Sequence, residues 1–484
     1  MRAVLHFIGG TWSKAASGRT YDNRSPWSGE LIGPVAAGDE EDTRRAIDAA
    51  HRAFAQWSQA PPAQRQTILL RAADILDASR DNALESLALE TGCGSQFGRI
   101  QVDFAVSLLR QAAQLAYRPV GELLVSDIPG TQAMAVRRPV GVVGAIAPWN
   151  ASLTLSGRAI VGPIALGNTV VLKPSEESPY TGGAIWAEIL LEAGLPPGVL
   201  NVVTHAPGEA GVIADALLDS RHVKRINFTG STPTGRRLAE KAGSRLKRVV
   251  LQLSGQNPMI VAEDADVGYA VEAAAYGAFL HQGQLCMCAR RIYVARPVAD
   301  EFLARFAAKV ATLPAGDPAD PATVVGPVIN EWALATLERR VKQAVDAGAR
   351  VLAGGEATPP CYPATVLVDV PPDTELAEGE TFGPIVTVEI VESAEEAVEL
   401  ANRSDLGLVA SIISRDVPRA LRLASRLEVG IVHVNDQTVN DEPQMPFGGV
   451  KDTGWGRFGI GVAADEFTEL QWVSARDQDR AFPF

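Results

Sequence analysis

Cysteine is scarce in this chain, with four residues among 484: Cys93, Cys286, Cys288 and Cys361. So few cysteines in so long a chain do not form a disulfide framework, and they are typical of a reducing compartment. A zinc site is not expected, because no matching Cys/His pair lies near Cys286 and Cys288 to complete a set of ligands. We therefore predict a cytoplasmic protein without a metal centre.

Long basic runs and long apolar runs are absent as well. The net charge is −13, which argues against nucleic acid or an anionic membrane as the main partner. The closest candidate for a membrane span, AIVGPIALGNTVVL, is interrupted by Asn168 and two glycines. The apolar patch in the first residues is too short and too soon broken for a signal peptide. The sequence therefore predicts no membrane partner and no nucleic-acid partner.

The dinucleotide fingerprint G-x-G-x-x-G is missing from the predicted strand-to-helix turns. One of these turns is FTGSTPTG, in which Phe228 ends a strand and Thr232 opens a helix. Ser231 can cap that helix, and the backbone N–H groups of Gly230 and Ser231 can face a phosphate. Gly-Ser-Thr before a helix is also routine turn chemistry, so this stretch alone leaves both interpretations open.

What the chain does contain is two series of β-branched strands that alternate with helices. Its length exceeds one hydrophobic core, so at least two domains are expected. The alternation predicts parallel sheets covered on both faces, with ligands at the carboxyl ends of the strands. The first series is GVVGAIAP, TVVLKP, LNVVT, KRINFTG and RVVLQL, with helices near 155–166, 180–193, 208–218 and 232–242. The second series includes NPMIVA, RIYVA, IVTVEIV, LVASIIS and GIVHVN.

The segments outside these series are simpler. A helix begins at about residue 39 and is stopped by Pro61, and a second helical region runs from about 63 to 117. PVGELLVSDIPGTQAMAVRRPV is typical of a β-hairpin. The tail, FTELQWVSARD, has a strand-like centre that can pair with another element or with another subunit.

The stretch FLHQGQLCMCARR places Cys286 between a helical run and the strand RIYVA. A cysteine at such a junction can gain from nearby helix-end dipoles, and its thiolate is a strong nucleophile. The alternative is a small buried hydrophobe, the usual role of an intracellular cysteine. His281 lies five residues earlier and raises the further possibility of a Cys-His hydrolase, which would leave nothing cofactor-like to explain.

Seven motifs together resemble the NAD(P)-dependent aldehyde dehydrogenase superfamily. They are, in order, APWN, VVLKPSEESP, INFTGST, VLQLSGQNP, HQGQLCMCARR, EGETFGPIV and MPFGGVKDTGWGR, and they extend along essentially the whole chain. Three segments are similar to the branch that oxidises benzaldehyde, vanillin and salicylaldehyde. These are LSGRAIVGPIALGN with Arg158, the FLHQGQ lead-in, and VNDEPQMPFGG.

The resemblance implies a covalent mechanism. Cys286 would attack the aldehyde, the thiohemiacetal would pass hydride to nicotinamide, and water would hydrolyse the remaining thioester. Asn150 would form the oxyanion hole with the Cys286 backbone N–H, although alone it is equally a turn residue. The substrate pocket would contain Arg158, Cys288 and Phe447, the last of which is by itself more typical of plain packing.

The resemblance also implies the cofactor contacts. Lys173 and Glu176 would hold the adenosine ribose, and the Glu176 carboxylate favours NAD over NADP because it repels a 2′-phosphate. By themselves, both are typical of solvated charges in a polar loop. Trp149 would also bind the cofactor. The other implied contacts are Gly230 and Ser231 at the pyrophosphate, Glu380 at the nicotinamide ribose, and Phe382 beside the ring.

Gln252 departs from the family pattern, which has a glutamate at this position, 34 residues before the nucleophile. A neutral amide cannot accept the proton that a general base must take, so deacylation is expected to be impaired. Three explanations are open: an engineered substitution, another base with Glu380 as the nearest candidate, or release of the thioester to coenzyme A. The aromatic-branch segments favour the first two. A deacylation-defective protein that binds NAD and aldehyde is the rival interpretation.

The predicted architecture is two Rossmann-like α/β domains plus a small β oligomerisation element. The NAD-binding domain would comprise residues 1–120 and 138–253, and the catalytic domain residues 254–467. The hairpin 121–137 and the tail 468–484 would bridge the subunits of a dimer or tetramer, because edge strands of this kind usually pair.

Overall fold

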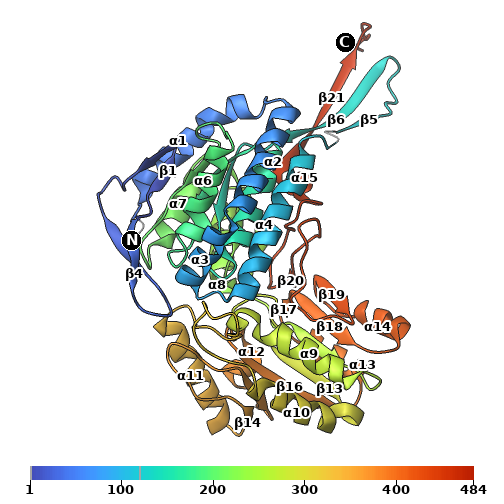
Figure 1. Cartoon of the computed structure of the whole chain (residues 1–484). Helices are drawn as coiled ribbons and strands as arrows, with labels where there is room; N and C mark the ends of the chain where they lie inside the picture. The colour runs from blue at the N-terminus through green and yellow to red at the C-terminus, as the bar shows by residue number, and fades with distance from the viewer. Residues whose placement is uncertain (1–2, 119–120) are drawn as a thin grey trace.

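The computed structural model describes residues 3–118 and 121–484. Figure 1 shows two α/β bodies and a narrow β-ribbon that projects away from them and carries the C-terminus. The first body contains a seven-stranded sheet in the order β11-β10-β7-β8-β9-β1-β2. Its five parallel strands are the predicted first series: β7 (Val142–Ile146), β8 (Thr169–Lys173), β9 (Leu200–Val202), β10 (Val223–Thr229) and β11 (Arg248–Gln252). The antiparallel strands β1 (His6–Ile8) and β2 (Thr11–Ser13) extend one edge.

The second body contains a seven-stranded sheet in the order β14-β15-β16-β13-β12-β18-β19. The predicted second series forms β12 (Pro258–Val261), β13 (Arg291–Ala295), β16 (Ile385–Val391), β18 (Val409–Ile413) and β19 (Ile431–Val434), all parallel. Two strands were not predicted, the antiparallel edge strand β14 (Arg350–Ala353) and the parallel strand β15 (Thr365–Val368). The fold class is therefore the predicted one.

The predicted helical region 63–117 is three helices: α2 (Pro62–Ala78), α3 (Arg80–Thr91) and α4 (Ser95–Leu115). Gly92 ends α3 with a left-handed φ of 62°, a conformation in which a Cβ is strained. The other helices are α1 (Glu40–Trp57), α5 (Ser152–Ala165), α6 (Ile185–Glu192), α7 (Ala210–Asp219), α8 (Thr232–Ser244), α9 (Val267–Phe279), α10 (Arg296–Ala311), α11 (Glu331–Asp346), α12 (Glu375–Glu378), α13 (Ala394–Asn402), α14 (Val417–Ala424) and α15 (Ala463–Phe467).

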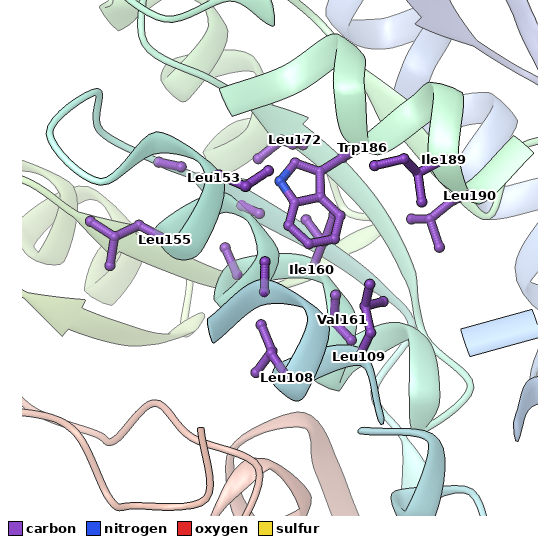
Figure 2. Packing of buried hydrophobic residues seen from close by; sticks show 14 of the residues in the cluster. Leu108, Leu109, Leu153, Leu155, Ile160, Val161, Leu172, Trp186, Ile189 and Leu190 are labelled. Carbon is purple, nitrogen blue, oxygen red and sulfur yellow. The ribbon is translucent and has the colours of Figure 1, made fainter. Parts of the chain in front are cut away.

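Helix α5 lies in the middle of the first core, and all of its residues are buried. Trp186 of α6 is fully buried beside it, with Leu108 of α4 and Ile160 of α5 in the same cluster (Figure 2). A Cβ added at Gly157 would lie 2.4 Å from the Trp186 ring, so only glycine permits this approach. The close packing fixes α5, the helix that carries Arg158.

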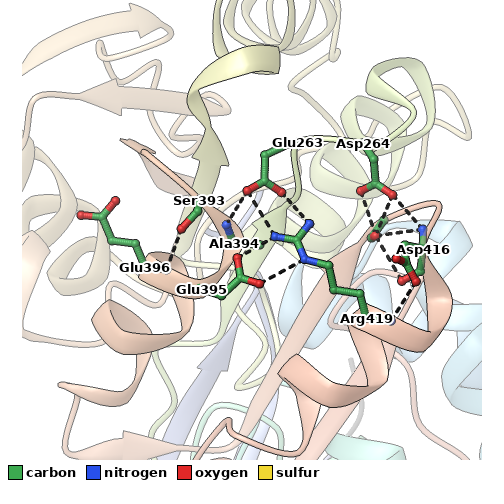
Figure 3. Close-up of polar contacts among 9 residues, drawn as sticks. Glu263, Asp264, Ser393, Ala394, Glu395, Glu396, Asp416 and Arg419 are labelled. Carbon is green, nitrogen blue, oxygen red and sulfur yellow. Dashed lines mark hydrogen bonds and ion pairs between the residues drawn. The ribbon is translucent and has the colours of Figure 1, made fainter.

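An ion-pair cluster joins α13 and α14 to the end of β12 in the second body. Arg419 donates to the carboxylates of Glu263 (2.8 Å) and Glu395 (2.6 Å), as Figure 3 shows. Burial alone would raise the pKa of Glu263, but the Arg419 guanidinium holds it below its ordinary value. The side chains are partly exposed, so the cluster fixes the positions of these helices more than it adds stability.

The projecting ribbon is a three-stranded antiparallel sheet in the order β21-β6-β5. The predicted hairpin forms β5 (Gly121–Leu124) and β6 (Thr131–Pro139), and the tail forms β21 (Thr468–Arg476), which pairs with β6 of the same chain. The domain limits stay predictions, and residues 1–2 and 119–120 of the first predicted segment lie outside the described residues. Among the described residues, no helix is long and apolar enough to cross a bilayer.

Candidate functional site

Cys286 lies in the turn between α9 and β13, as the sequence predicts. A short 3-10 helix, Leu280–Gly283, follows α9, and His281 and Gln282 within it have left-handed φ values of 51° and 55°. The chain reverses direction at these two residues, and Cys286 in the following turn is partly exposed. The helix end adjoining this turn is the C-terminus of α9, which carries partial negative charge, so α9 does not supply the helix-dipole gain expected for a thiolate.

Two side chains that the sequence analysis missed hold this turn in place. The Asn257 amide donates to the carbonyl oxygens of Cys286 (2.5 Å) and Cys288 (2.9 Å). Arg290 donates to the Leu285 carbonyl (3.2 Å) from one side and to the Gly383 carbonyl (2.8 Å) from the other. Asn257 has a left-handed φ of 34° just before β12. The only sequence signal for Asn257 was its place in LSGQNP.

A cavity of about 360 Å³ brings together predicted residues from both bodies. It lies between the carboxyl ends of the first-body strands and the start of α11. The indole of Trp149 meets the Phe382 ring edge-on, with centroids 5.6 Å apart. Its wall includes these residues singled out from the sequence: Trp149, Asn150, Gly230, Ser231, Gln252, Cys286, Glu380 and Phe382.

A second cavity, of about 300 Å³, lies on the other side of Cys286. Cys286 and Asn150 line both cavities, and they are the residues the two walls share. The second wall is largely apolar and contains Phe104, Arg158 and Phe447. Two predicted pocket residues, Arg158 and Phe447, are therefore found beside Cys286.

Cys288 and His281 lie elsewhere. Cys288 is absent from the walls of both cavities, is fully buried, and its thiol faces the Leu280 carbonyl at 3.7 Å. Its predicted place on the substrate-pocket wall is therefore not seen, because the thiol points back toward the Leu280 carbonyl. The buried His281 ring stacks on Phe97 at 4.9 Å and lines neither cavity, which removes the basis for a Cys-His hydrolase. Among the described residues, no cluster of three or more His, Cys, Asp or Glu could hold a metal.

Charge is disfavoured around the sulfur. Burial, and then the nearby Glu380, raise the pKa of the Cys286 thiol to about 12. Burial also raises the pKa of Glu380, whose carboxylate accepts the Gly255 N–H at 3.4 Å. The thiol and the carboxyl therefore each oppose ionisation of the other, and either can hold a proton when the other has lost one.

Gln252, at the end of β11, lines the same cavity as Cys286. Its Nε2 donates to the Leu253 carbonyl at 3.2 Å. Its Oε1 is buried and has no donor within residues 3–118 and 121–484. An unpaired buried oxygen costs free energy unless a ligand or water satisfies it, so this atom marks a polar point on the cavity wall.

The FTGSTPTG turn differs from its predicted chemistry. Ser231 is at the N-cap position of α8, but its hydroxyl donates to Thr234 Oγ1 (3.0 Å) and caps no backbone N–H. The Gly230 N–H donates to the Gln252 carbonyl (3.0 Å) and so is not free to bind a phosphate. What remains for an anion is the N-terminus of α8, where Ser231 lines the cavity.

Lys173 and Glu176 are not solvated loop charges. Lys173 is buried at the end of β8, and its Nζ lies 2.9 Å from Nε2 of His205. The His205 Nδ1 faces the Ala206 carbonyl at 2.9 Å, so Nδ1 carries the proton and Nε2 accepts from Lys173. Glu176 lies 3.8 Å from the same Nε2. Burial lowers the pKa of Lys173 to about 8 and that of His205 to about 4.

Asp441 is the third residue that the sequence analysis missed. Its carboxylate accepts a hydrogen bond from Nη2 of Arg158, and both side chains are almost fully buried. The Arg158 guanidinium carbon lies 4.4 Å from the Phe447 ring centre and 5.0 Å from that of Phe104. Burial raises the pKa of Asp441, and Arg158 opposes that shift. Nothing in NDEPQ distinguishes Asp441 from the acidic residue beside it.

Residues 12–473 match the Aldehyde dehydrogenase family. The chain is an aldehyde dehydrogenase. It is 44% identical over 483 residues to the vanillin dehydrogenase of Pseudomonas fluorescens, covering 100% of both chains. It is 42% identical over 460 residues to the NAD(+) benzaldehyde dehydrogenase of Pseudomonas putida, covering 95% of this chain and 94% of that one. The crystal structure of the salicylaldehyde dehydrogenase from Pseudomonas putida G7, complexed with salicylaldehyde, matches with a TM-score of 0.97 at 39% identity, covering 100% of both chains.

Membership of this family means that the aldehyde dehydrogenase is an oxidoreductase acting on aldehydes with NAD(P). The predicted family and fold class are confirmed. The roles of the individual site residues stay predictions.

Proposed function

We propose that this aldehyde dehydrogenase oxidises aromatic aldehydes to carboxylic acids with NAD. The supporting observation is that Cys286 lies on the wall shared by two cavities, one of which is walled by Phe104 and Phe447. A flat ring is well matched to a cavity of about 300 Å³ with such walls. The names of the vanillin, benzaldehyde and salicylaldehyde dehydrogenases support the same substrate class.

The first chemical step is attack by the Cys286 sulfur on the aldehyde carbon. Its raised pKa keeps the thiol protonated near neutral pH, so a base must take the proton as the bond forms. The Glu380 carboxylate shares the cavity with Cys286 and can take it. The Asn150 amide and the Cys286 backbone N–H then donate to the developing oxyanion, which typically lowers a barrier by about 3 kcal/mol.

The residues around the larger cavity fit the nicotinamide half of NAD, which when bound supplies the hydride acceptor. Trp149 and Phe382 offer aromatic faces, Glu380 offers a carboxylate for ribose hydroxyls, and the N-terminus of α8 at Ser231 offers partial positive charge to a phosphate. Lys173 and Glu176 would hold the adenosine ribose. The Glu176 carboxylate disfavours a 2′-phosphate, which is why we propose NAD over NADP.

The second step, hydrolysis of the thioester, is where Gln252 limits the enzyme. Its amide can position a water molecule through the unpaired Oε1 but cannot accept a proton from it. Among the described residues on the larger cavity's wall, Glu380 is the only carboxylate. We therefore propose that acylation is retained, that the thioester on Cys286 accumulates, and that Glu380 supports slow deacylation.

The projecting sheet supports association with a second copy. Leu124, Leu470 and Trp472 occupy one face of it, and Trp472 is 77% exposed. Large apolar side chains on an exposed sheet with open edges are typical of an interface between subunits. We propose that this sheet forms a dimer or a larger assembly.

The decisive experiment is rapid mixing of the protein with NAD and benzaldehyde, followed by intact mass of the quenched protein. A burst near one NADH per subunit, with an acyl adduct on Cys286, is expected. Glu380→Gln should then slow the burst and remove the slow turnover that follows it. Sustained turnover that survives in Glu380→Gln would refute Glu380 as the base. Neither burst nor adduct with several aromatic aldehydes would refute the proposed substrate class.

A further inference from the structure

We infer that the buried Arg158–Asp441 pair binds a hydroxyl group on the substrate ring, at the position opposite the aldehyde. The preferred substrates are thus 4-hydroxylated benzaldehydes, in preference to benzaldehyde or its 2-hydroxy isomer. This inference rests on the proposed function and adds to it the position of the recognised substituent.

The order of the cavities places Asp441 at the opposite end of the smaller cavity from the reacting sulfur. The smaller cavity shares Asn150 and Cys286 with the cofactor cavity at its inner end. It shares Ile100, Phe104 and Asp441 with an open surface groove of about 920 Å³ at its outer end. An aromatic ring whose aldehyde carbon lies at Cys286 therefore directs its opposite edge toward Asp441. A hydroxyl next to the aldehyde would instead remain near the inner end.

The Arg158–Asp441 pair has more hydrogen-bonding groups than the protein itself satisfies. Arg158 donates to Asp441 through Nη2, whereas its buried Nε and Nη1 find no acceptor among the residues that the structure describes. A guanidinium has five N–H donors, and a buried donor left unpaired costs free energy. Asp441 lines the smaller cavity, so a phenolic O–H there would donate to its carboxylate. The pair thus offers an acceptor for the hydroxyl, held in place by Arg158.

The same pair explains why a hydroxyl can be accepted without loss of reactivity. A phenolate opposite the aldehyde would push electrons into the carbonyl and make its carbon a poorer target for the Cys286 sulfur. Asp441 places a negative charge beside the ring oxygen, which opposes loss of the phenolic proton, while Arg158 keeps the pair neutral overall. The rings of Phe104 and Phe447 lie against the guanidinium.

The test measures the apparent second-order rate constant of the burst for the unaltered protein with each of four aldehydes. 4-Hydroxybenzaldehyde and 4-methylbenzaldehyde have the same shape, so their ratio isolates the hydrogen bonds. We expect 4-hydroxybenzaldehyde to be favoured by about tenfold or more, because a site that pairs with a hydroxyl rejects the analogue that lacks it. We also expect it to exceed benzaldehyde and 2-hydroxybenzaldehyde. Equal rates for the hydroxy and methyl compounds, or a preference for the 2-hydroxy isomer, would overturn the inference.

Two variants assign the effect to the pair. Asp441→Asn keeps the size of the side chain and should bring the hydroxy-to-methyl ratio toward one. Glu442→Gln removes the neighbouring carboxylate, which is exposed and lines only the surface groove, and should leave the ratio unchanged. A ratio that persists in Asp441→Asn would overturn the assignment. Bursts with all four aldehydes but no discrimination would refute only this inference, whereas no burst with any of them would refute the proposed function as well.

Discussion

Gln252 differs from glutamate by one NH2 in place of one oxygen, so Gln252→Glu should preserve the fold. We expect the steady rate of NADH formation to rise by about 10²–10⁴-fold, the typical contribution of a general base. The acyl adduct on Cys286 should disappear from the quenched protein. The measurement is multiple-turnover NADH formation beside intact mass. A persistent adduct in Gln252→Glu would show that something other than this amide blocks hydrolysis.

The raised pKa of Cys286 predicts a reactivity that increases with pH. Because burial moves the pKa of the thiol from 9.0 to about 12, the free protein holds little thiolate at pH 7. The rate of alkylation by iodoacetamide should therefore rise about tenfold per pH unit up to pH 10 without reaching a plateau. The adduct is followed by mass, with Cys286→Ser to assign it. A plateau below pH 8 would show that the thiol is already ionised there.

Cofactor choice is tested at Glu176. Glu176→Gln removes the charge that would repel a 2′-phosphate and leaves Lys173 nearby to bind it. The ratio of kcat/KM for NADP to that for NAD should rise by about tenfold or more, equivalent to about 1.4 kcal/mol. Glu177→Gln is the matched control, because Glu177 accepts from Asn330 (2.7 Å) instead and should not alter the ratio. An unchanged ratio in Glu176→Gln would refute its role in selecting NAD.

At the scale of elements, the cysteine turn depends on one amide that bridges two carbonyls. Asn257→Gly keeps the left-handed backbone but removes both hydrogen bonds, at a cost of about 1–3 kcal/mol. We expect a lower melting temperature and a burst slowed by about tenfold or more, because a displaced sulfur attacks poorly. Stopped-flow NADH formation and thermal unfolding measure the two effects.

Asn435→Gly is the matched control for Asn257→Gly. Asn435 also has a positive φ, 56°, and its amide oxygen accepts from the Ser414 N–H at 2.9 Å. It should lower stability while leaving the burst rate unchanged. If both variants slow the burst equally, the effect belongs to general loosening of the fold and not to the cysteine turn.

The elements themselves were largely predictable, because runs of β-branched residues between helices leave few alternatives to parallel strands. Strand β14 was missed because its edge position leaves it half exposed and without a clear apolar pattern. The contacts between elements were not predictable. Asp441 and Arg158 form a hydrogen bond although they are 283 residues apart in the sequence, and Asn257 and Cys286 do so 29 residues apart. Hydrogen bonds over such separations leave no local pattern, so the resemblance pointed to the cysteine as the candidate nucleophile but not to the residues that hold its turn.

At the scale of the whole molecule, the projecting sheet predicts the state of assembly. Trp472→Asp places a charge on the exposed apolar face and should shift the protein toward a monomer in light scattering at micromolar concentration. Leu421→Asp is the control, since Leu421 is 58% exposed on α14 of the second body, which Figure 1 shows far from this sheet. A monomer in the unaltered protein would contradict the proposed interface.

Two separate cavities meet at Cys286, and under the proposed function the aldehyde would enter one and NAD the other. An acyl group on the sulfur would then fill the aldehyde side and leave the other side clear. Spent NADH could then leave and fresh NAD could enter while the thioester awaits hydrolysis, so coenzyme exchange would be faster than turnover. Aldehyde and NAD should accordingly never compete for one entrance, and inhibitors of each side should be able to occupy the same molecule together.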